Sequence, residues 1–191
     1  YHGVGEFKNN GNIYTGNFVE NNKTGYGKMT YKNGSIYQGE WLNNDKHGKG
    51  KLTYEKKYYK NSSVYDGEWF NDNKHGKGNM YYENGDIYEG GWFDNLKQGY
   101  GEFTSFSGIV YKGQWLNNKY HGNGELIIPM NQKFKKNDRG THKYNGEFKY
   151  DLRNGHGIYF LKEKGIIYRG NYVNNKKNGK GIQSYPKGNK Y

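Results

Sequence analysis

Residues 36–54 read IYQGEWLNNDKHGKGKLTY and contain two short runs of alternating side chains. In the first run, Tyr37, Gly39 and Trp41 alternate with polar residues; in the second, Gly50 and Leu52 alternate with lysine and threonine. Successive side chains of a β-strand point to opposite faces, so a period of two predicts strands and not helices. The stretch therefore predicts a pair of strands, each with one aromatic or apolar face and one polar face.

This pattern is repeated along the whole chain. The motif Tyr-x-Gly-x-aromatic occurs seven times, and Gly-x-Gly begins seven residues after its last aromatic residue each time. The seven motifs begin at Tyr14, Tyr37, Tyr65, Tyr88, Tyr111, Tyr144 and Tyr168. A fixed period is the signature of a repeat protein. We interpret residues 1–191 as one array of about seven complete units, with partial units at both ends that suggest a longer array.

The connections between units carry a turn signal. Asn10-Gly11, Asn33-Gly34 and Asn84-Gly85 each separate one unit from the next, and Asn-Gly is typical of tight hairpin turns with positive φ. Each unit is then a β-hairpin, and consecutive hairpins follow one another in one sheet. The predicted fold class is all-β: an elongated single-layer antiparallel meander of hairpin repeats.

The composition shows what the core must be made of. The chain has 31 Gly, 27 Asn, 27 Lys and 22 Tyr but no Ala and no Cys. So few aliphatic residues at a net charge of +12 would suggest disorder, but the aromatic residues recur at fixed positions. A glycine between aromatic residues leaves a gap in which a neighbouring ring can lie, and aromatic rings bury enough area to replace an aliphatic core.

The Tyr-x-Gly-x-Trp and His-Gly-x-Gly pattern at a step of 23 residues resembles the MORN (membrane occupation and recognition nexus) repeat. The resemblance implies a twisted antiparallel sheet with an aromatic groove. It also implies the settings in which such arrays occur: junctophilins, alsin, plant phosphatidylinositol phosphate kinases, radial-spoke heads and protist cytoskeletal proteins. The expected groove residues are Tyr37, Trp41, Tyr65, Trp69, Tyr88, Trp92, Tyr111 and Trp115.

Nothing in the sequence forms a catalytic, cofactor or metal site. The histidines that precede Gly-x-Gly are His2, His47, His75 and His121. Consecutive ones lie two strands apart, a separation of roughly 10 Å, which is too far for them to share a metal ion. We expect them to make a polar contact that closes the loop.

Glu40, Glu68 and Glu147 occupy one slot of the motif, where we expect cross-strand pairs with lysine, such as Glu40 with Lys49. Gly-x-Gly lacks the following helix that a nucleotide site needs. We therefore expect no enzyme activity, no cofactor, no metal and no small-molecule substrate.

The net charge of +12 suggests an acidic partner. A/T-rich codons for Lys and Asn explain much of this charge, and the aromatic rings belong to the core, so we expect no nucleic-acid binding. The leading interpretation is a non-catalytic scaffold that binds protein or itself in a cytoskeletal or membrane-linked assembly. Alternatives are a peripheral module that contacts anionic phospholipid, and the regulatory array of an enzyme outside this chain. The absence of Cys favours a reducing compartment, and we expect the chain in the cytoplasm.

Length varies only in the connections between units. Insertions fall near residues 55–64 and 129–143. The segment between the two strands of each unit, such as 42–47, always has six residues, and we expect it to be a loop. In a meander, the connections between units share one edge, and the variable side of a repeat protein is often its binding side. The candidate edge-loop contacts are Lys133, Phe134, Lys135, Lys136 and Arg139.

The polar face turns apolar late in the chain. Positions occupied by Lys or Thr in early units hold Ile127, Ile158, Phe160 and Ile182 in later ones. A strand that is apolar on both faces requires cover on both. The cover would be a second copy of the chain, a different protein, or residues 129–143 folding back. The resemblance to MORN arrays, which can pair through terminal repeats, favours a homodimer.

Overall fold

The computed structural model describes residues 1–129 and 141–186. Its chain divides into two compact parts, Tyr1–Leu96 and Lys97–Tyr191. These two parts are called the first and the second unit from here on, and each hairpin is called a repeat. The strands of the first unit are β1 (Gly3–Asn9), β2 (Asn12–Val19), β3 (Asn22–Thr30), β4 (Ile36–Leu42), β5 (Asp45–Thr53), β6 (Val64–Phe70), β7 (Asn73–Tyr81) and β8 (Ile87–Phe93). Those of the second are β9 (Leu96–Thr104), β10 (Val110–Leu116), β11 (Lys119–Ile128), β12 (His142–Lys149), β13 (Leu152–Leu161), β14 (Ile166–Val173) and β15 (Lys176–Ser184). A single 3-10 turn, η1 (Lys162–Lys164), joins β13 to β14.

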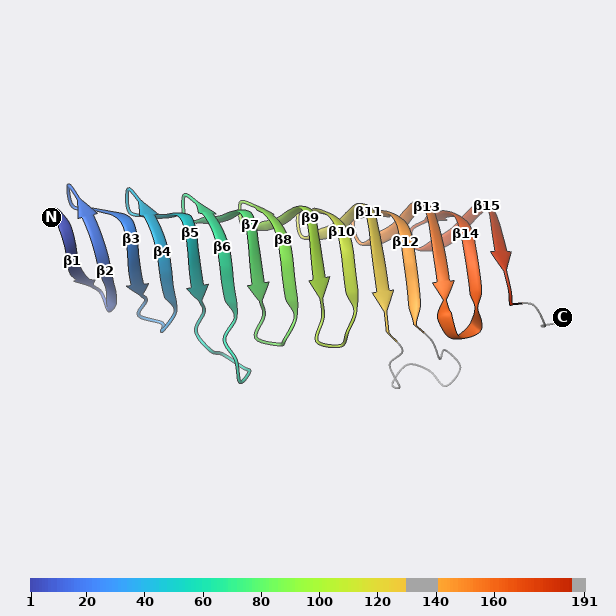
Figure 1. The fold of residues 1–191 in the computed structure, drawn as a ribbon, viewed down its shortest axis with the longest axis horizontal. Helices are drawn as coiled ribbons and strands as arrows, with labels where there is room; N and C mark the ends of the chain where they lie inside the picture. The colour runs from blue at the N-terminus through green and yellow to red at the C-terminus, as the bar shows by residue number, and fades with distance from the viewer. Residues whose placement is uncertain (130–140, 187–191) are drawn as a thin grey trace. The chain divides into compact units, whose positions relative to one another are not determined.

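Each unit is an antiparallel meander (Figure 1). In the first unit every strand from β1 to β8 pairs with the next along the chain, and in the second the same holds from β9 to β15. The described residues contain no α-helix. The predicted all-β, single-layer antiparallel meander is confirmed.

The connection inside each repeat is a two-residue turn, so the six-residue loop expected at 42–47 is wrong. β4 ends at Leu42 and β5 begins at Asp45, and only Asn43 (φ 48°) and Asn44 (φ 77°) lie between them. Positive φ at both central residues defines a type I′ turn, whose twist matches that of the flanking strands. Positive φ at both turn residues recurs at 20–21, 71–72, 94–95, 117–118, 150–151 and 174–175.

The connections between repeats are more varied. Asn10-Gly11 is a two-residue turn with positive φ at both residues, as predicted. At Asn33-Gly34 only the glycine has positive φ, and the Gly34 N–H donates to the Tyr31 carbonyl at 2.8 Å. That geometry is a β-turn followed by a left-handed residue, the usual three-residue hairpin connection. The longer connection at 54–63 lies at the same end of its strands as the other connections between repeats in the first unit (Figure 1).

The core lies on one face of the sheet, which we call the aromatic face. Tyr37 and Trp41 of β4 are buried while Gln38 and Glu40 between them are exposed, as the alternation predicts. The Tyr37 ring lies over the glycines of two strands: a Cβ built on Gly50 would lie 2.2 Å from the Tyr37 hydroxyl oxygen. The glycines therefore hold the space in which the aromatic core packs.

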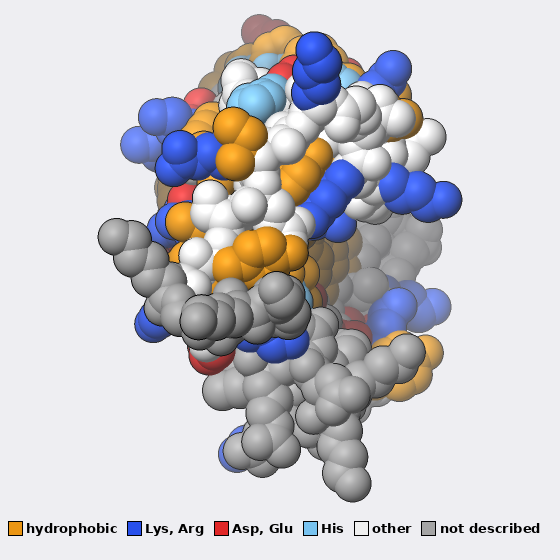
Figure 2. All heavy atoms as spheres, turned by 90° about the vertical axis from the view of Figure 1, so that its right-hand side faces the viewer, with side chains coloured by type: hydrophobic (Ala, Val, Ile, Leu, Met, Phe, Trp, Pro, Cys, Tyr) orange, Lys and Arg blue, Asp and Glu red, His pale blue; other side chains and the backbone are white. Residues whose placement is uncertain are grey.

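Charge is dispersed over the face of the molecule that Figure 2 shows. In the view of Figure 2, Lys and Arg side chains lie scattered among uncharged ones and do not form one patch. Among residues 1–129 and 141–186, no helix has the length and apolar character needed to span a membrane.

Candidate functional site

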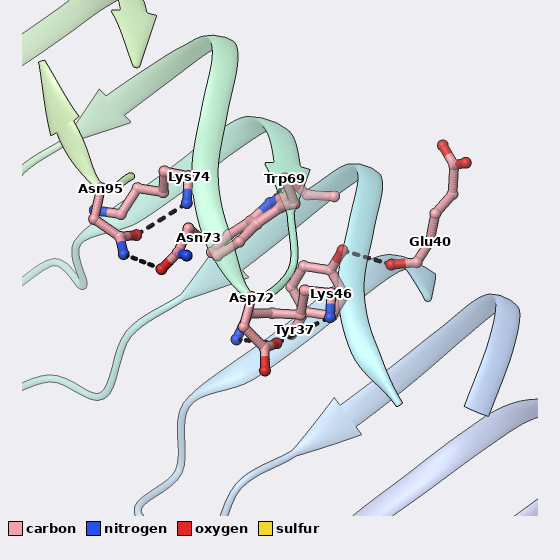
Figure 3. A network of polar contacts seen from close by, with 9 residues as sticks. Tyr37, Glu40, Lys46, Trp69, Asp72, Asn73, Lys74 and Asn95 are labelled. Carbon is pink, nitrogen blue, oxygen red and sulfur yellow. Dashed lines mark hydrogen bonds and ion pairs between the residues drawn. The ribbon is translucent and has the colours of Figure 1, made fainter. Parts of the chain in front are cut away.

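Successive repeats are joined by a ladder of side-chain hydrogen bonds at the type I′ turns. The Oδ1 atom of Asp72, the second turn residue, accepts the backbone N–H of Lys46 in the preceding repeat at 2.9 Å. The Asp72 N–H in turn donates to the Lys46 carbonyl at 3.0 Å. The same two bonds join Asn44 to Lys23, Asn95 to Lys74, Asn118 to Lys97, Asp151 to Tyr120 and Asn175 to Arg153. Figure 3 shows two rungs, at Asp72 and Asn95.

The Gly-x-Gly segment forms a β-bulge that a carboxylate holds. The register shifts between Gly39 and Trp41. Gly48 has a φ of 57°, a left-handed conformation that glycine adopts without strain. The Glu40 Oε1 atom accepts the Lys49 backbone N–H at 3.0 Å. Equivalent bonds run from Lys77 to Glu68 and from His156 to Glu147. The expected Glu–Lys ion pairs are therefore wrong: these carboxylates bind backbone, not ammonium groups.

The eight aromatic residues expected to line a groove are buried in the core. Tyr37, Tyr65, Tyr88 and Tyr111 are inaccessible to solvent, and the four tryptophans are at most 5 % exposed. Each tyrosine meets its own repeat's tryptophan edge-to-face; for Tyr37 and Trp41, the ring centroids are 5.1 Å apart. Each tryptophan Nε1–H donates to a glycine carbonyl of the preceding repeat, as Trp69 does to Gly50 at 2.9 Å.

Cations cover these rings on the solvent side. The Lys23 ammonium lies 4.6 Å from the centroid of Trp41, and Lys46 and Lys74 lie 5.1 and 4.8 Å from Trp69 and Trp92. Such cation–π contacts favour the charged amine over an electron-rich ring, yet burial lowers the pKa of Lys74. On the aromatic face of the first unit, partly buried lysines therefore lie over the rings.

The candidate interface residues lie on the opposite, polar face of the second unit. Ile158 and Phe160 flank Tyr159, which pairs with Tyr144 and Tyr168 on the aromatic face. Ile158 is 40 % exposed and Ile182 is 72 % exposed. A cationic residue of the intervening strand lies between the members of each pair. Lys143 lies between Ile127 and Phe160. Arg169 lies between Ile158 and Ile182. We call Ile127, Ile158, Phe160 and Ile182 the apolar patch.

The repeat itself decides the family. The MORN repeat model matches residues 14–36, 37–57, 65–87, 88–110, 111–133, 144–162 and 168–190, which together cover most of the chain. This chain belongs to the MORN repeat family. A search of curated proteins found no match.

Among the described residues, the expected loop-closing polar contact of the MORN-repeat histidines occurs only at His75, where Nδ1 lies 3.9 Å from the Asp94 carboxylate. The Nδ1 atoms of His47, His75 and His121 are buried without a hydrogen-bond partner within the described part of the chain. Their rings instead pack on aromatic residues of the following repeat: His47 lies 5.2 Å from Phe70 and His121 lies 5.1 Å from Tyr150. Within residues 1–129 and 141–186, no three His, Cys, Asp or Glu side chains cluster to hold a metal ion.

The expected edge-loop contacts of this MORN array lie outside the described residues. Lys133, Phe134, Lys135, Lys136 and Arg139 all fall in 130–140. Their contact with a partner stays a prediction.

Asp72 makes the ladder sensitive to pH. Partial burial on its own would raise its pKa, but hydrogen bonds from the Lys46 amide and ammonium outweigh that effect and hold the pKa below its ordinary value of 3.8. The ammonium lies 3.0 Å away. A carboxyl group whose pKa is lower in the folded state stabilises the fold above the unfolded pKa, and this stabilisation is lost as the pH falls through the folded value.

Asp72→Asn tests this rung, because asparagine occupies the same position at Asn44, Asn95 and Asn118. We expect a loss of about 0.5–1 kcal/mol at pH 7, because the substitution keeps an Oδ1 acceptor and removes a partly exposed ion pair. Asp72→Ala leaves the Lys46 N–H without this acceptor and should cost about 1 kcal/mol. Urea unfolding at pH 7 and pH 3 measures both. The deficit of each variant relative to the parent should shrink at pH 3, and equal deficits at both pH values would contradict this role.

Proposed function

We propose that this MORN repeat chain is a non-catalytic scaffold that binds protein, chiefly a second copy of itself, within a cytoskeletal or membrane-linked assembly of the cytoplasm. The apolar patch on the second unit is the observation that supports this proposal most directly. The ladder, the bulge and the ring-covering lysines use their polar groups to build the repeat, and the repeat module is generally non-catalytic. These features leave surface recognition as the activity that the array supports.

The polar face of the second unit is apolar at positions that are polar in β3. In β3, the positions equivalent to Ile158 and Phe160 are Lys28 and Thr30, which lie one and three residues after the second glycine of Gly-x-Gly. Ile182 stands largely in solvent, and Ile158 and Phe160 are partly exposed. Apolar area left in water is unfavourable. Ile182 and Ile158 alternate with Arg169, which provides the mixed apolar and charged surface that is common in protein interfaces.

Contact with anionic lipid remains a weaker part of the proposal. A membrane surface attracts clustered lysines by about 1 kcal/mol each. In this chain Lys23, Lys46 and Lys74 are held over tryptophan rings, and the charges seen in Figure 2 are dispersed. We therefore propose at most weak, non-specific lipid contact.

The double substitution Ile158→Lys with Phe160→Glu tests self-association. We expect the parent chain to be a dimer by light scattering and the double variant to be a monomer, because two charges would be placed in the apolar patch. Thr30→Glu, at the position equivalent to Phe160 in the first unit, is the matched control and should leave the dimer intact. An unchanged dimer for the double variant, or a monomeric parent at high concentration, would exclude pairing through this patch.

A further inference from the structure

A cavity of about 640 Å³ opens on the aromatic face of the second unit, opposite the apolar patch. Its lining includes Leu126, Tyr144, Phe148, Arg153, Tyr172 and Lys177. The volume falls within the range of small-ligand sites, about 300–1,000 Å³. The lining is mainly aromatic and aliphatic, with a few polar groups converging on it, which is the composition such sites have.

Smaller side chains explain why the cavity occurs here. Early repeats place a tyrosine, such as Tyr54, four residues after the second glycine of Gly-x-Gly, whereas the equivalent position in the cavity lining holds Ile128. Phe148 and Tyr172 likewise stand where four other repeats have tryptophan. The strands pair in the same antiparallel order as in the earlier repeats, so smaller side chains at these positions leave space against the sheet.

Two cations at the cavity have no carboxylate partner among the described residues. Arg153 donates from Nη2 to the Asn175 carbonyl at 3.1 Å and from Nε to Asn175 Oδ1 at 3.4 Å. A guanidinium has five N–H donors, so three remain beside the cavity. Lys177 donates to Gln183 Oε1 at 2.6 Å. Lys46, at the position equivalent to Arg153 in the first unit, is by contrast paired with Asp72.

Tyr172 carries a buried hydroxyl group that the fold does not use. The side chain lines the cavity and is 2 % exposed, and its hydroxyl oxygen has no hydrogen-bond partner in the described structure. The first tyrosine of every motif does have one; the Tyr144 hydroxyl, for example, donates to the Glu147 carbonyl at 3.1 Å. A buried polar group without a partner is destabilising, so Tyr172 is a group to be explained by a ligand.

We propose that this cavity binds a carboxylate joined to one aromatic or branched apolar group. The guanidinium of Arg153 pairs with the carboxylate, since its planar fork matches two carboxylate oxygens. Lys177 adds a second positive charge, the apolar group packs against Leu126 and Phe148, and the Tyr172 hydroxyl supplies a further hydrogen bond.

One lining residue selects between anions. Asp151 also lines the cavity, where its Oδ1 accepts the Tyr120 N–H at 2.8 Å and its carboxylate lies 3.9 Å from the Lys119 ammonium. Its negative charge repels a dianion more strongly than a monoanion. The site therefore suits a carboxylate better than a phosphate.

Calorimetric titration of the 191-residue chain with 3-phenylpropionate tests the proposal. We expect saturable binding that is weaker by about tenfold or more for the neutral alcohol 3-phenylpropanol, and little or none for inorganic phosphate. The peptide acetyl-Gly-Gly-Phe with a free carboxyl end distinguishes the source of the ligand. Tighter binding of the peptide than of the acid would assign the site to the end of a partner chain, and equal or weaker binding to a free acid. Either result supports the carboxylate site.

Three variants identify the residues that bind. Arg153→Met should weaken 3-phenylpropionate binding by about tenfold or more. If that variant fails to fold, Arg153→Lys is used instead, because lysine keeps a cation over the aromatic rings, as in earlier repeats, but lacks the planar guanidinium group. Tyr172→Phe should weaken binding by about threefold or more while leaving the free chain at least as stable. Lys23→Met, which removes the ring-covering cation of a first-unit repeat, is the matched control and should change nothing.

Three outcomes would overturn this assignment. They are equal affinity for the acid and the alcohol, no binding at about 10 mM acid, and unchanged affinity in both the Arg153 and the Tyr172 variants. The outcome is separate from that of self-association, because the cavity and the apolar patch lie on opposite faces and light scattering reports only the latter.

Discussion

Gly39→Ala is expected to destabilise the first unit by about 3 kcal/mol, near the upper end for a single added methyl group in a packed core. A Cβ atom at residue 39 would lie 2.4 Å from the Gly50 Cα, 2.6 Å from the Lys49 carbonyl oxygen and 2.6 Å from the Tyr37 hydroxyl oxygen. Two of these three atoms belong to the backbone of the paired strand. No side-chain rotation can therefore relieve the contact, and β4 and β5 must move apart.

Gly5→Ala provides the control for this substitution. Gly5 belongs to a Gly-x-Gly segment and pairs with Gly16 as Gly50 pairs with Gly39. A Cβ at Gly5, however, would meet only the Phe18 ring at 3.6 Å, an ordinary van der Waals distance. We expect a change within about 0.5 kcal/mol. Urea unfolding followed by tryptophan fluorescence compares the two variants. Similar midpoints for both would show that the close approach of the strands at Gly39 does not limit stability.

The sequence predicted the fold because it carries two independent signals, the alternation in every repeat and the Asn-Gly pairs at three of the connections between repeats. The alternation of Tyr37, Gly39 and Trp41 with polar residues specifies a strand with one buried face, and the Asn-Gly pairs specify antiparallel reversal. Tyr-x-Gly-x-aromatic also specifies the core, because a ring such as that of Tyr37 fits only over glycine. Strand direction, face and core follow from these local features without knowledge of distant contacts.

The turns inside the repeats were misassigned because their chemistry is not that of Asn-Gly. The type I′ turn at Asn43 and Asn44 requires positive φ at two residues that are not glycine, which Asn and Asp tolerate better than other residues. A signal was present: the second turn residue is Asn or Asp in all seven repeats. Its role as a rung depends on the preceding repeat, so a pattern read within one repeat does not reveal it.

The bulge and the cavity required three-dimensional information for different reasons. The bulge turns the backbone N–H of Lys49 toward Glu40, so the recurring glutamate looks like a partner for lysine side chains until the register shift is known. The cavity lies where Ile128 replaces the tyrosine of earlier repeats, and a smaller side chain leaves a cavity only where the neighbouring side chains do not fill the space. Arg153 and Tyr172 were consequently not recognised as candidate site residues.

Trp69→Ala is expected to cost about 3–5 kcal/mol, the range for removing a large aromatic residue from a core. The ring lies between two tyrosines, with centroids 5.3 Å from Tyr37 and 5.1 Å from Tyr65, and its Nε1–H donates to the Gly50 carbonyl at 2.9 Å. The loss is therefore shared by two repeats. Each repeat of a linear array depends mainly on its neighbours, so amide hydrogen exchange should accelerate across β4–β7 while β12–β15 stay protected.

Trp69→Phe keeps a ring, as Phe18 and Phe148 do at the same motif position, and should cost about 1–2 kcal/mol. Uniform loss of protection in both units, or equal costs for the two substitutions, would contradict a core built from nearest-neighbour ring contacts.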